Sequence, residues 1–282
     1  MKKISLFLSC LALLLQFAAS SAQSRSERLA EYVYYFASDS LHGRAAGSPD
    51  ARKAREYIVE RYKECGVQPF FNGNFMVPFE RNGEQYVDVV GIIEGNELKD
   101  EYIVLGAHYD HLGIKKGQIY PGADDNASGS AALIEVAREL CARRGELKRS
   151  VIIAAFDAEE LGLYGSDYLA EFLDTVVGIE HIKFMMSIDM VGWYAKNGKL
   201  ILEGVSTIKD GKKLAGGPAE SNAVKLQMKD FERGTFVATD TQGFAKRHIP
   251  TIFATTGLKS PYHKPGDKAE LIDYEGLDKV SG

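Results

Sequence analysis

The chain has 282 residues, of which 45% are hydrophobic and 26% charged, a balance typical of a globular protein with a sizeable core. Its net charge is -5, and no run of five or more basic residues occurs, which argues against nucleic acid and anionic membranes as partners. Because no repeat, low-complexity tract or Pro-rich linker divides the sequence, we expect a single domain over residues 23–282.

Residues 1–22 have the pattern of a secretory signal peptide. Two lysines precede an apolar run, and small residues lead to a cleavage site before Gln23. The apolar run, residues 4–19, is shorter than the ~20 residues of a membrane-spanning helix, and lipid attachment at Cys10 is the weaker alternative. We therefore expect a secreted or periplasmic protein with no membrane contact after cleavage.

Two helical patterns, at 26–37 and 49–65, come first, and short apolar runs then alternate with helical patterns. The expected strands are YVDVVGII (86–93), YIVLGA (102–107), SVIIAAF (150–156), IKFMMSI (182–188), LILEG and IPTIFA (249–254), with helices at 128–144, at 166–173 and from YEGLDKV near the end. This alternation predicts an α/β three-layer sandwich with a central, mostly parallel, mixed β-sheet flanked by helices. Cys65 and Cys141 match no metal motif, and we expect Cys141 to be a buried free thiol.

Three of the expected strands end in ionisable residues. YIVLGA leads to His108, SVIIAAF to Asp157, Glu159 and Glu160, and IKFMMSI to Asp189. Ligands of open α/β sheets bind outside the carboxyl ends of the strands, so these side chains should converge on one crevice. Imidazole and carboxylate are zinc ligands, which makes His108 and Asp189 candidates. Asp110 is positioned to orient His108 and not to bind metal.

The segment PGADDNASG, residues 121–129, carries two adjacent aspartates directly before a helix. A cation is one reason to keep both carboxylates ionised, and Asp124 would then be the bridging ligand, with Asp125 in support. The alternative needs no metal: Asp125, Asn126 or Ser128 forms an Asx turn and a helix N-cap.

The pair Glu159 and Glu160 offers two carboxylates that point in different directions. We assign Glu160 to a metal and Glu159 to proton transfer. His263 lies between Pro261 and Pro265, in a loop that would hold a ligand still. The other histidines, including His111, are interpreted as structural or solvated, although His111 is near enough to line the cleft.

In order and type, five motifs resemble those of the clan MH zinc exopeptidases, the family typified by secreted bacterial leucyl aminopeptidases. They are GAHYDHLG, PGADDNASG, FDAEELGLYGS, SIDMVG and PYHKPGD, and the N-terminal segment ASDSLHGRAAGSP also resembles the family's. The resemblance implies two zinc ions: His108 and Asp189 on one, Glu160 and His263 on the other, and Asp124 bridging, with a cis peptide between Asp124 and Asp125. It also implies Glu159 as general base, Asp110 orienting His108, and a peptide substrate with a free N-terminus. The chain departs from many relatives at Thr239-Asp240-Thr241, where they carry Ser-Asp-His.

Two other functions fit parts of this pattern. Glutaminyl cyclases share the fold and much the same ligand set, but they typically work with a single zinc. Their bridging motif resembles an Asp-Ser pair, where this chain has Asp124 and Asp125. They also have a tryptophan-lined pocket, whereas Trp193 is the only tryptophan in this sequence. A non-catalytic binding ectodomain on this fold would have lost ligands or the base, and this chain keeps all of them. No G-x-S-x-G and no G-x-G-x-x-G after a strand occurs, which disfavours a serine hydrolase and a dinucleotide enzyme. No feature of the sequence indicates an oligomeric state.

Overall fold

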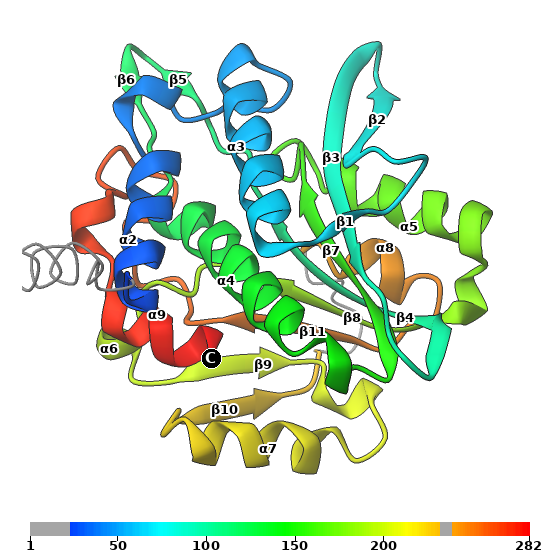
Figure 1. Cartoon of the computed structure of the whole chain (residues 1–282). Helices are drawn as coiled ribbons and strands as arrows, with labels where there is room; N and C mark the ends of the chain where they lie inside the picture. Colours follow the sequence, from blue (N-terminus) through cyan, green and yellow to red (C-terminus); the bar gives the residue numbers. More distant parts are fainter. Residues whose placement is uncertain (1–22, 232–238) are drawn as a thin grey trace, which may run out of the picture.

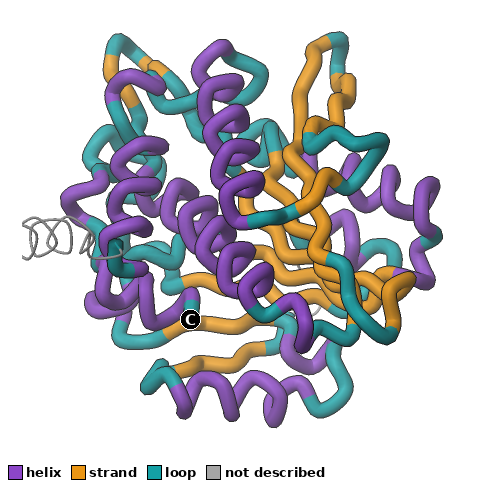
Figure 2. Tube along the Cα trace, in the orientation of Figure 1, coloured by secondary structure: helices purple, strands orange, loops and turns teal. Residues whose placement is uncertain are grey.

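The computed structural model describes residues 23–231 and 239–282, so the expected signal peptide, residues 1–22, lies outside the described residues. Its centre is a twisted nine-stranded sheet with helices on both sides (Figures 1 and 2). The strand order is β1-β3-β7-β4-β8-β11-β9-β10, with β2 paired to β3. The expected sandwich of helices around a mixed sheet is confirmed.

The strands of this sheet are, in chain order, β1 (Gln68–Pro69), β2 (Met76–Arg81), β3 (Glu84–Ile93), β4 (Leu98–His108), β7 (Arg149–Phe156), β8 (Ile182–Ile188), β9 (Leu200–Glu203), β10 (Leu226–Lys229) and β11 (Thr251–Thr255). A separate hairpin joins β5 (Ile114–Lys115) and β6 (Gln118–Ile119). The central strands β7, β4, β8 and β11 pair in parallel, whereas β2, β3 and β9 join their neighbours β3, β7 and β11 antiparallel. The carboxyl ends of the four central strands therefore share one edge.

Two hydrophobic cores lie on opposite faces of this sheet, as β7 illustrates. Its residues alternate between them: Ile153 belongs to the core with helices α2 (Arg25–Phe36), α3 (Pro49–Cys65), α4 (Gly129–Ala142) and α9 (Tyr274–Ser281), and Ile152 to the core with α5 (Tyr164–Val177) and α8 (Gln242–Ala245). Because helices cover both faces of the sheet, the sequence of β7 is a continuous run of mostly apolar residues, without the alternation of apolar and polar residues that a half-exposed strand shows.

Local sequence explains where the first helices begin and end. Ser24 and Glu27 form a capping box at the start of α2, and α3 begins with Ser48 as its cap and Pro49 in its first turn. Gly66, with φ of 85°, ends α3 in the left-handed region that glycine adopts without strain. These two helices lie within a residue of the expected ranges.

The sequence patterns missed the elements at the edges of the fold. Helix α7 (Gly211–Ser221) contains Gly216, Gly217 and Pro218, which are poor helix formers, and it packs on the short edge strand β10. Strand β2 contains Pro78, and α6 (Tyr194–Asn197) is a single turn. Helix α5 extends beyond the expected 166–173 on both sides.

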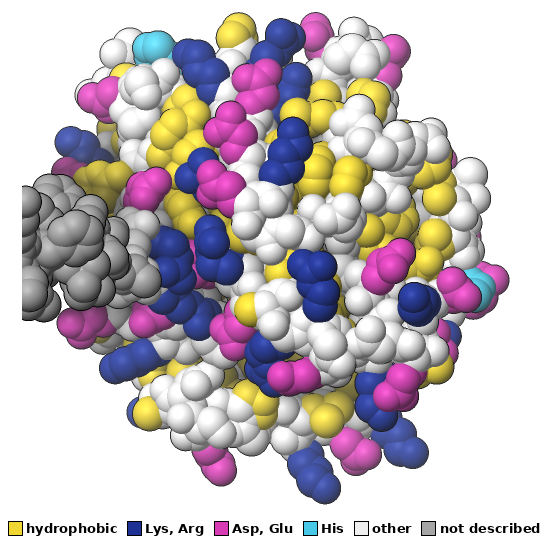
Figure 3. Space-filling model, in the orientation of Figure 1, with side chains coloured by type: hydrophobic (Ala, Val, Ile, Leu, Met, Phe, Trp, Pro, Cys, Tyr) yellow, Lys and Arg dark blue, Asp and Glu magenta, His cyan; other side chains and the backbone are white. Residues whose placement is uncertain are grey.

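Three further features bear on the expectations from sequence. Cys65 and Cys141 are free, and Cys141 is buried as expected. Among the described residues, no helix has the length and apolar character needed to cross a membrane. On the face in Figure 3, cationic and anionic side chains are interspersed.

Candidate metal centre

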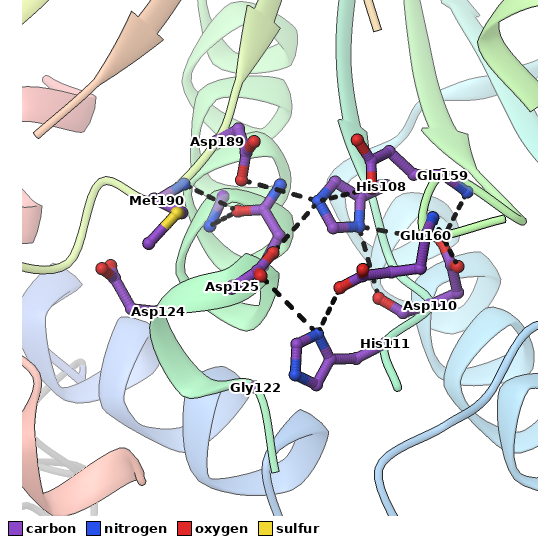
Figure 4. Close-up of polar contacts among 12 residues, drawn as sticks. His108, Asp110, His111, Gly122, Asp124, Asp125, Glu159, Glu160, Asp189 and Met190 are labelled. Atoms are coloured by element: carbon purple, nitrogen blue, oxygen red, sulfur yellow. Dashed lines mark hydrogen bonds and ion pairs between the residues drawn. The ribbon is translucent and has the colours of Figure 1, made fainter. Parts of the chain in front are cut away.

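The ionisable residues at the strand ends converge on one site. His108 is the last residue of β4, Asp189 follows β8 directly, and Glu159 and Glu160 lie three and four residues beyond β7. Strands β7, β4 and β8 are neighbours in the sheet, so their carboxyl ends bring these residues together (Figure 4). Ala158, whose φ is 56°, turns the chain between β7 and the two glutamates.

One group of possible metal ligands surrounds the His108 ring. Its Nε2 atom lies 3.4 Å from Oδ1 of Asp125 and 3.5 Å from Oδ1 of Asp189. These three residues form a group whose ligand atoms lie within 4.8 Å of one another. The His108 and Asp125 side chains are almost completely buried.

A second group shares the Asp125 carboxylate. Its other oxygen, Oδ2, lies 3.0 Å from Nε2 of His263, and the same nitrogen lies 3.1 Å from Oε2 of Glu160. The buried His111 also faces this group, with Nδ1 2.7 Å from Oε1 of Glu160 and 3.8 Å from Oδ2 of Asp125. The two oxygens of Asp125 therefore face two different sets of ligands.

The structure corrects the position expected for the bridging carboxylate. Asp124 is directed away from His108 and Glu160 (Figure 4); its Oδ1 accepts hydrogen bonds from the Gly192 N–H at 2.9 Å and the Ser128 hydroxyl at 3.3 Å. Asp125 takes the shared position, because its backbone leaves the helical region (φ -106°, ψ 93°) just before α4. The cis peptide expected between Asp124 and Asp125 is instead between Asp125 and Asn126.

Asp110 supports the glutamates as well as His108. Its carboxylate oxygens accept the backbone N–H groups of Glu159 and Glu160 at 3.1 and 3.3 Å. Nδ1 of His108 lies 3.7 Å from the Asp110 carboxylate and 3.3 Å from the Asp110 carbonyl oxygen. Asp110 therefore joins the end of β4 to the turn after β7, and Asp267 similarly accepts the backbone N–H groups of Asp124 and Asp125.

Burial and crowding of acidic groups shift the proton affinities of the site. Burial raises the pKa of Glu159 well above its ordinary value, and the charges of Asp240 and Asp189 add to the shift. Burial alone would lower the pKa of His108, but the Glu159 charge and the neighbouring aspartates outweigh it and raise that pKa. Burial also raises the pKa of Asp240 to about 7.

The cluster has the chemistry of a metal site. Three buried carboxylate oxygens, Asp125 Oδ2, Glu160 Oε1 and Asp189 Oδ1, take part in no hydrogen bond within the described part of the chain. The polar neighbours of these oxygens are imidazole nitrogens of His263, His111 and His108 at 3.0, 2.7 and 3.5 Å. Buried carboxylates crowded together are costly, and a divalent cation held between them and the imidazoles would offset that cost. The imidazoles are those of His108 and His263, with His111 beside them, and the carboxylates are those of Asp125, Glu160 and Asp189. Zinc prefers both kinds of ligand.

A cleft of about 490 Å³ opens beside the cluster. Its walls include Glu159 and His263 from the cluster and the apolar Met190, Ile201 and Phe253. At the departure from the family pattern, Thr239 lines the cleft and its hydroxyl lies 2.8 Å from that of the buried Thr241, while Asp240 is buried. The cleft is large enough for an amino-acid side chain next to the cluster.

Six of the residues expected at the site lie together in this cluster, and two other members of the cluster were not expected as ligands. Those brought together are His108, Asp110, Glu159, Glu160, Asp189 and His263. Asp125 was expected only to support its neighbour, and His111 was interpreted as structural or solvated. The signal for His111 was its place three residues after His108 in the same loop.

Comparison with family models matches residues 88–282 to "Peptidase family M28". Similar curated proteins include a probable zinc metalloprotease of Leptosphaeria maculans, 33% identical over 53% of this chain and 32% of that protein. Aminopeptidase YwaD of Bacillus subtilis is 27% identical over 68% of this chain and 42% of its own length. Glutaminyl-peptide cyclotransferase of Drosophila melanogaster is 22% identical over 84% and 74%. The chain spans less than half the length of the first two.

Solved structures share the fold. An aminopeptidase from Aneurinibacillus sp. strain AM-1 superposes with a TM-score of 0.70 at 18% identity, covering 91% of both chains. The Legionella pneumophila LapA aminopeptidase gives a TM-score of 0.71 at 21% identity, covering 91% of this chain and 69% of the other. At these identities the likeness establishes the fold alone.

Proposed function

Since the chain belongs to peptidase family M28, we propose that it is a two-zinc exopeptidase that removes N-terminal residues from peptides. The observation that carries this proposal is the position of Asp125. One of its oxygens lies 3.4 Å from His108 and the other 3.0 Å from His263. A carboxylate that faces two ligand sets is suited to bridge two metal ions.

Each ion would have its own ligands besides the shared Asp125. His108 and Asp189 would hold one, and Glu160 and His263 the other, with His111 beside Glu160. When bound, zinc would supply an acidified water and polarise the carbonyl of the scissile bond. The remaining steps belong to side chains of the protein.

Glu159 is the residue suited to move the proton. Glu159 lines the cleft, its carboxylate has an oxygen 3.9 Å from His108 Nε2, and Asp110 accepts its backbone N–H. It would take a proton from the attacking water and return it to the amine that leaves, as one positioned carboxylate can do in both directions. The raised pKa of Glu159, caused first by burial, favours proton acceptance.

The names of the relatives support peptide chemistry but include a second reaction. YwaD is an aminopeptidase, whereas the Drosophila relative is a glutaminyl-peptide cyclotransferase. For this chain, either reaction would take place at the free N-terminus of a peptide. Zinc content and product identity separate the two proposals for this chain.

We expect the purified chain to hold two zinc ions per molecule by atomic absorption and to release p-nitroaniline from aminoacyl p-nitroanilides. Removing metal with a chelator should abolish the activity, and adding zinc should restore it. The reason is that the proposed reaction depends on a water molecule made acidic by zinc. One zinc per molecule, together with pyroglutamate formed from a peptide with N-terminal Gln, would support the cyclase in place of the peptidase.

Glu203 is expected to influence which N-terminal residue is cleaved. Glu203 and Lys229 both line the cleft, and the Glu203 carboxylate pairs with the half-exposed Lys229 at 3.5 Å. An N-terminal Lys or Arg side chain could replace Lys229, because an exposed ion pair contributes only about 0.2–1 kcal/mol. The ratio of kcat/KM for Lys to Leu anilides should fall by up to about fivefold in Glu203→Gln and rise in Lys229→Met. An unchanged ratio in both variants would contradict this role.

A further inference from the structure

Arg44 is the largest fully buried side chain of the described residues, and it reaches the metal centre from outside the part of the chain that matches the family model. It lies in the loop between α2 and α3, within the segment LHGRAAG. The matched residues begin at 88, so the comparison of families assigns nothing to this position.

The Arg44 guanidinium makes five hydrogen bonds, all to backbone carbonyl oxygens. The acceptors are the carbonyl oxygens of Pro121, Tyr109 at 2.8 Å, Phe36 at 3.1 Å, Gly122 at 2.7 Å and Asp125 at 3.4 Å. A guanidinium has five N–H donors in a fixed planar fork, so its donor capacity is used. No other side chain has this geometry.

Four of these five carbonyls, all except that of Phe36 at the end of α2, belong to the two backbone segments that carry the proposed metal ligands His108 and Asp125. Tyr109 lies between His108 and Asp110, and residues 121–125 form the turn that presents Asp125. The Arg44 carbonyl in turn accepts the His111 N–H at 3.2 Å. Arg44 therefore joins the backbone at the end of β4 to the backbone of the turn before α4.

Its charge also suits this place. The guanidinium is buried near the acidic Asp125, Asp110, Asp267 and Glu160, whose negative charges it offsets. Burial of a cation whose contacts are carbonyl groups is costly. The position of Arg44 therefore indicates a role beyond packing.

We propose that Arg44 is a positioning residue of the metal centre, which fixes the His108 and Asp125 segments relative to one another and so sets the affinity for metal. This inference rests on the proposed two-metal site. It assigns Arg44 no contact with substrate and no part in proton transfer.

Metal binding tests the proposal independently of catalysis. Zinc is removed from the purified full chain, and Co²⁺ binding is followed by its visible absorption and by calorimetry, for wild type, Arg44→Lys and Arg44→Met. We expect affinity to fall about 10- to 100-fold in both variants, as when the groups supporting metal ligands are removed. Lysine should not rescue, because it keeps the charge but lacks the planar fork.

A matched control separates positioning from general stability. Arg28 pairs with the buried Glu135 at 2.6 Å, between α2 and α4 and outside the metal cluster. Arg28→Met should lower the melting temperature without changing Co²⁺ affinity. Unchanged affinity in both Arg44 variants would overturn the inference, as would an equal loss in Arg28→Met.

The remaining outcomes are also decisive. If neither Arg44 variant folds, as judged by circular dichroism, Arg44 acts through global stability and the inference is wrong. If wild type binds no Co²⁺ or zinc, the proposed function fails and this inference fails with it. Wild-type binding with unaltered variants overturns the inference alone.

Discussion

Asp125→Asn is expected to abolish metal binding and activity, whereas the same substitution at the neighbouring Asp124 leaves both nearly intact. Asp125 lies within 3.4 Å of His108 Nε2 and 3.0 Å of His263 Nε2, so it serves both ligand sets. Removing one charged partner at a buried site costs about 3–5 kcal/mol. We therefore expect the affinity for each ion to fall roughly 10²- to 10⁴-fold.

Asp124→Asn is the matched control because its side chain has a different task. Its Oδ1 accepts the Gly192 N–H at 2.9 Å, and the carbonyl oxygen of an asparagine amide can accept the same bond. Zinc per molecule should stay at the wild-type value, and kcat/KM should stay within about tenfold of wild type, which is the lower bound for loss of a group that supports metal ligands. Zinc per molecule and anilide hydrolysis are measured for both variants. Metal loss in Asp124→Asn with retention in Asp125→Asn would restore the assignment made from sequence.

The contrast between these aspartates illustrates how far the sequence predicts the site. His108 and Asp189 could be assigned because each lies at the carboxyl end of an apolar strand, and such ends meet at one edge of a parallel sheet. Which of two adjacent carboxylates faces that edge depends instead on the backbone. Gly122 has φ of 59° and Asp125 departs from helical angles, and no residue pattern specifies this turn.

His111 and Arg44 were missed for related reasons. His111 lies in an irregular loop, where no period of two or 3.6 residues says which way a side chain points. The segment around Arg44 resembles the family's, but the hydrogen-bond partners of Arg44 are all carbonyl oxygens, a group that every residue carries, so residue types do not reveal its role. The central strands were predicted because burial on both faces makes their apolar runs continuous, whereas the edge strands β2 and β10 lack that pattern.

Glu159→Gln should nearly eliminate turnover while leaving the metal content at the wild-type value. Glu159 lines the cleft, and its carboxylate lies 3.9 Å from Nε2 of the proposed ligand His108. Its backbone is held by Asp110 at 3.1 Å, a bond that glutamine at this position keeps. Glutamine has nearly the same shape but cannot accept the proton, so kcat should fall roughly 10²- to 10⁴-fold, the contribution typical of a positioned general base.

The neighbouring glutamate is the control that distinguishes the two proposed roles. Glu160 lies 3.1 Å from His263 Nε2, so Glu160→Gln should lose zinc as well as activity, and excess zinc in the assay should recover part of the activity. Excess zinc should not rescue Glu159→Gln, because its defect lies in proton transfer. The two variants are compared by zinc per molecule, kcat and KM. If Glu159→Gln loses metal in parallel with activity, Glu159 is a ligand and the proton is moved by another group.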